Sequence, residues 1–235
     1  MGTGKEELVV ITGASRGVGR ATALAVVREH GVRVLAVARD AGALERLKQE
    51  GAGRVEVLAL DIGSPDAPGM IKAAVARRRV RALVHCAGLL DKRPMGDHQR
   101  AVLERLYAVN VFAPLEITQA VVDELDGTPP GHVVHIGSMG GFQDSAKFPG
   151  LVAYSASKAA LACMAQCLAE EFKERGIRSN CLALGAVDTE MVREAFPGYQ
   201  APVTAEAMGA YVARFALEGH NLFNGKVLPV AVTTP

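Results

Sequence analysis

Tyr154 and Lys158 are the residues of this sequence whose types and spacing point most directly to chemistry. Four residues apart on a helix, their side chains lie on one face, one turn apart. A phenol has a pKa of about 10, but an ammonium group beside it favours the phenolate and lowers that value. The pair can therefore exchange a proton with a carbonyl or alcohol oxygen. The same spacing also arises by chance in many helices, where it forms only a surface pair.

A glycine-rich turn near the start of the chain predicts a nucleotide-binding loop. The apolar run 8–11 is typical of a buried strand, residues 20–30 have a helical pattern, and the segment 12–19 (TGASRGVG) connects them. Gly13 permits a tight turn, Gly17 lets a pyrophosphate approach the backbone, and Gly19 lets the helix pack on the sheet. We expect phosphates to lie at the helix N-terminus, where unpaired N–H groups favour negative charge.

The remaining sequence alternates apolar runs with helical patterns. Strands are expected at 32–38, 55–60, 82–85, 132–136, 177–184 and 226–230. Helices are expected at about 41–50, 65–79, 99–125, 151–175 and 204–218. Repeated strand–helix units predict an α/β fold, a doubly wound parallel sheet of about seven strands with helices on both faces. Ligands of such sheets bind beyond the carboxyl ends of the strands, which is where the two motifs fall.

In this order and separation, the two motifs resemble those of the short-chain dehydrogenases/reductases. The patterns are Thr-Gly-x-x-x-Gly-x-Gly at 12–19 and Tyr-x-x-x-Lys at 154–158, and the resemblance covers essentially all 235 residues. It implies one Rossmann-type domain over 1–235, with a nucleotide-binding part at about 8–90 and a catalytic and substrate-binding part at about 91–235. It also implies hydride transfer between a nicotinamide and the carbonyl or secondary alcohol of a small to medium-sized substrate.

The resemblance assigns a role to each of four catalytic residues. Tyr154 matches the proton donor and acceptor, and Lys158 matches the residue that lowers the tyrosine pKa and binds the nicotinamide ribose. Ser138 matches the residue that stabilises the substrate oxygen, and Asn110 matches the one that holds a water of the proton relay. An asparagine inside a helix carries a propensity cost, which also favours a role for Asn110.

Cofactor and substrate positions are implied in the same way. The residues that match cofactor-binding positions are Gly13, Ser15, Arg16, Gly17, Val18, Gly19, Arg39, Asp61, Ile62, Ala87, Gly88, Tyr154, Lys158, Val187 and Thr189. The substrate site is expected to be bounded by Leu90, Gln143, Phe148 and Met191. An oxo-acyl thioester, a sugar and a pterin carbonyl all remain open as substrates.

Arg16 and Arg39 bear on the choice between NADP(H) and NAD(H). The second strand ends in Ala38-Arg39-Asp40, without the acid that NAD-preferring relatives carry directly after this strand. The two arginines resemble the basic pair that binds the 2′-phosphate in NADPH-preferring relatives, and an arginine fork suits phosphate geometry. We expect NADP(H) to be preferred, while Asp40 leaves use of both open, and two solvated surface arginines are the alternative.

Two segments depart from the family pattern. His85-Cys86 stands where two asparagines usually precede the Ala-Gly pair, a change that affects local hydrogen bonding more than catalysis. Leu184 replaces a proline before Gly185, which relaxes a rigid turn. Val187 and Thr189 still match the positions that hold the nicotinamide carboxamide, so cofactor binding is expected to survive.

Composition and charge exclude several classes of function. With 49% hydrophobic residues and a net charge of +1, the chain can bury a sizeable core and has no electrostatic reason to bind nucleic acid or membranes. The segment 1–7 is polar, unlike a signal peptide, and the run Arg77–Arg79 is expected to form a solvated helix end. No metal site is expected. The four cysteines are expected to be buried reduced thiols of a cytoplasmic protein: Cys86, Cys163, Cys167 and Cys181.

The helix expected at 151–175 has apolar residues on several faces, which indicates burial of more than one side. Relatives pair through this helix, the one at 99–125 and the C-terminal strand, so a homodimer or homotetramer is expected. Two other functions stay open. One is a nucleotide-sensing scaffold of the same fold without turnover, and the other is an isomerase or dehydratase of the same superfamily. The intact Ser138, Tyr154 and Lys158 favour turnover.

Overall fold

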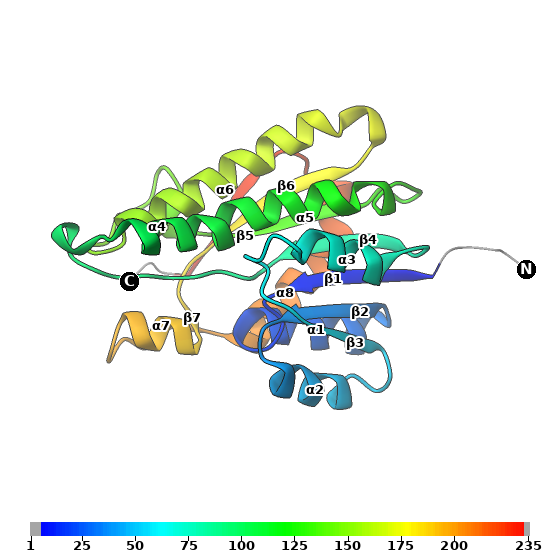
Figure 1. The fold of residues 1–235 in the computed structure, drawn as a ribbon, viewed down its shortest axis with the longest axis horizontal. Coiled ribbons are helices and arrows are strands. Elements are labelled where there is room, and N and C mark those ends of the chain that lie inside the picture. The colour runs from blue at the N-terminus through cyan, green and yellow to red at the C-terminus, as the bar shows by residue number, and fades with distance from the viewer. Residues whose placement is uncertain (1–5, 233–235) are drawn as a thin grey trace, which may run out of the picture.

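A parallel sheet of seven strands lies at the centre of the structure, a computed structural model that describes residues 6–232 (Figure 1). In spatial order the strands are β3 (Val55–Ala59), β2 (Arg33–Ala38), β1 (Glu7–Thr12), β4 (Arg79–His85), β5 (His132–Ser138), β6 (Arg178–Leu184) and β9 (Val227–Val230). The chain first winds from β1 to β3 and then crosses back to β4, so the winding reverses between β1 and β4. The predicted doubly wound α/β sheet is confirmed.

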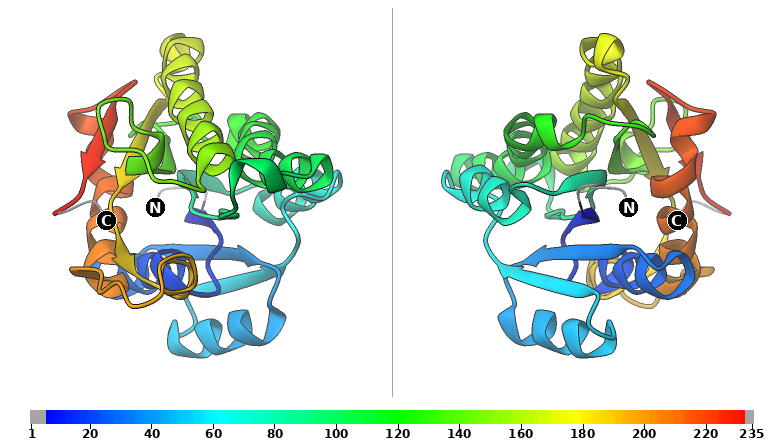
Figure 2. Two further views of the ribbon diagram at one scale, coloured as in Figure 1. Left: turned by 90° about the vertical axis from the view of Figure 1, so that its left-hand side faces the viewer. Right: turned by 90° about the vertical axis from the view of Figure 1, so that its right-hand side faces the viewer.

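Helices cover both faces of the sheet (Figure 2). One layer holds α1 (Gly17–His30), α2 (Ala41–Glu50) and α8 (Ala205–Glu218). The other holds α3 (Ala67–Val75), α4 (Arg100–Tyr107), α5 (Ala113–Val121) and α6 (Val152–Glu171). A short extension, made of β7 (Val187–Asp188), α7 (Glu190–Ala195) and β8 (Val203–Thr204), follows β6.

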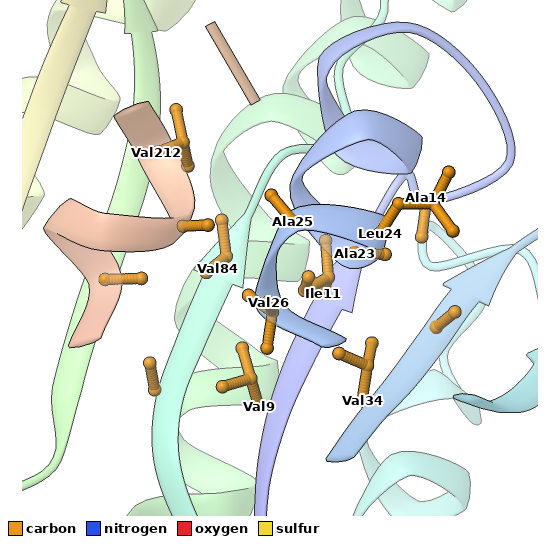
Figure 3. Packing of buried hydrophobic residues seen from close by; sticks show 14 of the residues in the cluster. Val9, Ile11, Ala14, Ala23, Leu24, Ala25, Val26, Val34, Val84 and Val212 are labelled. Carbon is orange, nitrogen blue, oxygen red and sulfur yellow. The ribbon is translucent and has the colours of Figure 1, made fainter. Parts of the chain in front are cut away.

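Alternation along the strands divides the core into two clusters. Val9 and Ile11 of β1 pack under α1, as Figure 3 shows, in a cluster that also includes Val84 of β4 and Val212 of α8, while Leu8 and Val10 pack in the cluster of α3 and α5. Successive strand residues point to opposite faces, and here both faces are covered, so all four β1 side chains are fully buried. This is why the strands read as continuous apolar runs in the sequence.

The predicted solvated helix end at Arg77–Arg79 is wrong. α3 ends at Val75, and Arg79 is already the first residue of β4. Arg78 pairs with Glu56 of β3 at 2.7 Å and Arg79 pairs with Glu7 of β1, with side-chain exposures of only 15% and 10%. Carboxylates near the amino ends of β3 and β1 therefore draw these two arginines onto the sheet.

Two of the four cysteines were also misplaced by the prediction. Cys181 is buried and Cys86 partly buried, but Cys163 and Cys167 are exposed on the outer side of α6. The sequence pattern of α6 is apolar on this side too, yet no element of residues 6–232 covers it.

Among the same residues, no helix is long and apolar enough to cross a membrane, and no group of three or more metal-ligating side chains could hold a metal ion. The first five residues of the polar segment 1–7 lie outside the described part of the chain.

Candidate active site

A cavity of about 820 Å³ runs along the carboxyl edge of the sheet, where the two predicted motifs meet. Its walls come from the glycine loop before α1, the ends of β2 to β6, and the segment from Gly185 into α7. The winding of the chain reverses at this edge, so two groups of strand ends open away from each other and leave room for a ligand.

Close backbone packing requires the glycines of the loop. Gly13 has a φ of +72°, and a Cβ there would lie 2.6 Å from the backbone of Ala87. A Cβ on Gly19 would collide with the carbonyl of Gly13. Within the described chain, Arg16 occupies the N-cap of α1 without a capping hydrogen bond from its side chain, so the first N–H groups of the helix remain available to an anion. The loop therefore fits the pyrophosphate of a dinucleotide.

Ser138, Tyr154 and Lys158 converge on the same cavity. Ser138 is the last residue of β5, where its Oγ accepts a hydrogen bond from Gly140 N at 3.1 Å. Tyr154 and Lys158 lie one turn apart on α6 and are 8% and 4% exposed. A strand end and the first turns of one helix thus place two hydroxyls and an ammonium at one point of the cavity.

Lys158 and Tyr154 do not yet interact in the expected way. The Lys158 ammonium donates to the carbonyl of Ile136 at 2.8 Å and lies 6.0 Å from the centroid of the Tyr154 ring. Burial raises the pKa of Tyr154, and only its hydrogen bond with Ser138 acts in the opposite direction. Burial also lowers the pKa of Lys158. The expected lowering of the tyrosine pKa by the lysine is therefore absent from this geometry, because the ammonium is turned to the Ile136 carbonyl.

Asn110 lies behind this set, in a π-helical turn. The helix predicted as one piece at 99–125 is α4, a π turn over Ala108–Phe112, and α5. Asn110 accepts from Leu89 N at 2.8 Å, and its amide donates to Leu89 O at 2.9 Å and to Ser157 Oγ at 3.0 Å. The side chain joins the segment after β4 to α6 and is fully buried. Its predicted contact with a relay water stays a prediction.

Several arginines line the cavity, two of them beside α2. Arg39 follows β2, Arg46 lies on α2, and Arg16 comes from the glycine loop. Arg16 pairs with Glu190 of α7 at 2.5 Å, and both side chains are more than half exposed. Asp40, the nearby acid, caps α2 by accepting from Ala43 N at 2.9 Å.

Asp61 lies where the cavity meets the end of β3. Its carboxylate accepts from Gly63 N at 3.0 Å and pairs with Arg105 of α4. Burial alone would raise the pKa of Asp61, but these bonds and the positive charges of Arg105 and Arg39 outweigh it, so the pKa is lowered. Arg105 and Arg46 were not predicted, since only tertiary packing brings these helix residues to the cavity.

The opposite end of the cavity is apolar. Of the residues expected there, Leu90, Phe148 and Met191 line the cavity, whereas Gln143 is exposed and is not among its lining residues. Sequence reasoning missed Leu151 and Phe196. Phe196 follows α7 and meets Phe148 edge to face, with ring centroids 6.1 Å apart. An aromatic residue in an irregular segment was the sequence signal that could have indicated a place for Phe196 at the cavity.

His85, one of the two residues before Ala87 that depart from the family pattern, contacts a side chain of α5. His85 Nε2 lies 2.9 Å from Thr118 Oγ1, and the ring stacks on His135 of β5 at 5.1 Å. Burial, with a smaller effect of Lys158, lowers the pKa of His85 to about 3, so the imidazole is neutral. Burial raises the pKa of Cys86 to about 11, so this thiol is not a nucleophile at neutral pH. Both residues therefore support the sheet.

The remaining predicted cofactor positions also lie at the cavity. They are Ser15, Gly17, Val18, Ile62, Gly88, Val187 and Thr189, together with Gly13, Gly19, Asp61 and Ala87. Thr189 caps α7 by accepting from Val192 N at 3.4 Å, so its hydroxyl also fixes the start of that helix. Residues from four separate parts of the chain thus form one continuous nucleotide-sized surface.

Comparison with known proteins agrees with this geometry. The family model described as short chain dehydrogenase matches residues 7–200. Protein FixR of Bradyrhizobium diazoefficiens is 34% identical over 199 residues, which cover 80% of this chain and 70% of FixR. Carbonyl reductase [NADPH] 2 of Sus scrofa is 32% identical over 185 residues, covering 78% of this chain and 73% of that enzyme.

Among solved structures, a short chain dehydrogenase from Shigella flexneri complexed with NADP superposes with a TM-score of 0.85. It is 26% identical, and the match covers 96% of this chain and 97% of the other. The chain therefore belongs to the short-chain dehydrogenase family. It is an oxidoreductase of that family, which acts on small molecules with a nicotinamide cofactor.

Proposed function

We propose that this protein is an NADP(H)-dependent reductase that interconverts a carbonyl compound and its secondary alcohol. The observation that carries the proposal is the convergence of Ser138, Tyr154 and Lys158 on a cavity that also contains the glycine loop. The scaffold and isomerase alternatives gain nothing from this arrangement, because it retains every group that a carbonyl reduction needs.

The chain's own groups supply proton transfer and orientation. When bound, the nicotinamide gives hydride to the carbonyl carbon or takes it from the alcohol. Because burial raises its pKa, Tyr154 is protonated at neutral pH and is ready to donate to the substrate oxygen. Ser138 donates a second hydrogen bond to the same oxygen and stabilises the charge that develops there.

Lys158 and Asn110 complete the proton path in this proposal. We assign Lys158 to the nicotinamide ribose, which requires its ammonium to leave the carbonyl of Ile136. Released in this way, the ammonium lies closer to the phenol and lowers the tyrosine pKa in the bound state. Asn110 and a water then return a proton to Lys158. The structure supports the first of these moves, because the Ile136 carbonyl is a single hydrogen-bond partner that a ribose hydroxyl can replace.

Arginines support the preference for the phosphorylated cofactor. Arg16, Arg39 and Arg46 offer three forks at the adenosine end, and charge-assisted bonds to phosphate are among the strongest hydrogen bonds in proteins. Among the nearby acids, Asp40 is held by the N-terminus of α2 and Glu190 is paired with Arg16. One relative is named for NADPH and one solved structure holds NADP, which agrees with this assignment.

Under the same proposal, the two parts of the chain contribute different groups to the site. The part at about 8–90 contributes the glycine loop, Arg39 and Asp61, and the part at about 91–235 contributes the catalytic set and the apolar end.

We further propose that the chain forms a homodimer or homotetramer through α5 and α6. Phe112, Leu115 and Val152 are 53%, 42% and 55% exposed there, and the family commonly forms oligomers.

A paired fluorescence titration with NADPH and NADH tests the cofactor assignment. Tight, selective binding of NADPH that is lost in Arg39→Asp is the expected result, because the substitution places a negative charge where the 2′-phosphate would lie. Lys72→Asp is the matched control, since Lys72 makes the same charge change on α3, outside the cavity. Equal affinity for both nucleotides would contradict the preference, and binding of neither would contradict the nucleotide site.

A further inference from the structure

The end of the cavity beyond Ser138 and Tyr154 has a uniform chemical character. Its lining side chains there are apolar: Leu90, Met139, Phe148, Leu151, Met191 and Phe196. The charged residues that line the rest of the cavity include two ion pairs. Arg16 pairs with Glu190, and Asp61 pairs with Arg105. Of the charged described residues nearest to this end, Lys158 belongs to the catalytic set and Glu190, next to Met191, is held in its ion pair with Arg16.

We propose that the substrate is an uncharged, largely apolar ketone or aldehyde whose ring or chain lies against Phe148 and Phe196. This inference rests on the proposed function, since it places the reacting carbonyl at Tyr154. It selects one substrate class among those that the sequence left open. A sugar or a hydroxy acid would bury hydroxyl or carboxylate groups here without partners, which is costly.

Tyr154 itself belongs to the apolar surface. It forms a buried cluster with Leu106 and Leu151, and Phe148 and Phe196 pack against the same cluster. A carbonyl oxygen bonded to the Tyr154 hydroxyl therefore has its carbon substituents next to these side chains. Aromatic rings offer large apolar area and edge-to-face partners, so a flat or cyclic substituent gains most from this wall.

Lys92 holds the aromatic wall in position without lining the cavity. Its ammonium lies 4.3 Å from the centroid of the Phe196 ring and donates to the carbonyl of Ala195 at 2.8 Å. These contacts join the segment after β4 to the end of α7. The cation–π contact uses the charge of Lys92 against Phe196, so the residue positions the wall and does not present its charge to a substrate.

Matched ketones test the substrate class. Turnover of acetophenone, of 4-acetylbenzoate and of a six-carbon ketose is compared with NADPH in excess. The first two differ by one carboxylate, and we expect kcat/KM for acetophenone to exceed each of the others by about 100-fold, as burial of an unpaired polar group implies.

Variants of Phe196 and Lys92 test whether the aromatic wall causes the preference for an apolar ketone. Phe196→Ala is expected to raise KM for acetophenone by about tenfold and to leave kcat nearly unchanged, while Phe196→Leu recovers part of the loss. Lys92→Met, which keeps the length of the side chain, is expected to raise KM by about threefold through a looser Phe196. Lys72→Met on the far helix α3 is the matched control and should behave as the wild type.

Saturation-transfer NMR of the protein with NADP⁺ provides a readout without turnover. Saturation of the acetophenone ring that disappears in Phe196→Ala supports the apolar subsite even where the reaction is slow. Equal turnover of 4-acetylbenzoate or the ketose, or an unchanged KM in Phe196→Ala, overturns the substrate class and leaves the reductase proposal intact. NADPH binding and NMR saturation without turnover of any carbonyl would instead overturn the proposed function.

Discussion

The two ends of the cavity differ in chemical character, and we propose that they recognise their ligands by opposite means. At the nucleotide end, Arg16, Arg39 and Arg46 project from a loop, a strand end and a helix and remain partly solvated. At the other end, Phe148 and Phe196 form a wall that carries no charge. Attraction between exposed charges weakens as salt screens it, whereas apolar burial does not. Under the two proposals above, the nucleotide end would select by adding contacts to a phosphate, and the substrate end would select by offering no contacts to polar groups.

Replacing Tyr154, which lies between the two ends of the cavity, is expected to change kcat more than any other substitution. Tyr154→Phe keeps the apolar wall and the arginines but removes the proton donor, so kcat should fall by about 10² to 10⁴. NADPH binding, measured by fluorescence titration, should remain within about twofold because the variant keeps the ring. A variant with wild-type kcat would show that the proton comes from another group.

Acid should destabilise the whole fold, because three buried histidines lie in β4 and β5. Burial is the main cause that lowers the pKa of His85 and His132 to about 3 and that of His135 well below its usual value. Unfolding returns each to a pKa of about 6.5, so the unfolded state binds more protons below that pH. Stability is therefore fully present above pH 6.5 and falls with acid, by up to about 1.4 kcal/mol per pH unit for each histidine.

Thermal unfolding between pH 7.5 and pH 5 measures this loss. The midpoint should fall over a range in which most carboxylates stay ionised, and His85→Asn should make the dependence on pH shallower. A midpoint that does not change over this range would contradict the assignment of neutral buried imidazoles.

Arg16→Gln tests the charged end alone. Loss of one charge-assisted bond should weaken NADPH binding by about tenfold and leave NADH binding nearly unchanged. Turnover of an apolar ketone at saturating NADPH should be unaffected, because Arg16 lies at the other end of the cavity. Equal losses for both nucleotides would show that Arg16 acts through the shape of the loop and not through the 2′-phosphate.

Glu190→Gln should give the smallest effect, in the opposite direction. Glu190 competes with a phosphate for Arg16, and an exposed ion pair contributes at most about 1 kcal/mol, so NADPH affinity should rise by about two- to fivefold. The gain should vanish in the double variant with Arg16→Gln, because the two residues act through one contact. An equal gain in both backgrounds would disprove the competition.

Sequence alone predicted the sheet and the glycine loop because short-range rules decide both. Buried parallel strands require continuous apolar runs, and Gly13 and Gly19 lie where any Cβ would collide with neighbouring backbone. The ends of the strands were predicted less accurately. β4, for example, begins three residues earlier than expected because Arg79 pairs with Glu7. Polar residues can extend a strand when charges on the next strand hold them.

Features that depend on distant parts of the chain could not be read from the sequence. Phe196 and Lys92 are far apart in sequence, and their contact exists only because α7 folds over the segment after β4. The turn of Lys158 toward Ile136 likewise depends on a strand that the helix pattern does not contain. The exposure of Cys163 and Cys167 depends on what covers α6, which periodicity does not specify.

The π turn at Ala108–Phe112 limits how the length of the chain can change. Such a turn holds one residue more than α-helical winding would, and each residue of a helix advances by about 100°. Deleting a single residue between α4 and α5 would close this wide turn into regular α-helix, while the helices on either side would keep the faces that they bury. Asn110, which reaches Leu89 and Ser157 from this turn, would then lose those contacts, although α5 would stay packed on the sheet. A deletion that many surface loops tolerate would here disconnect the catalytic helix from its support.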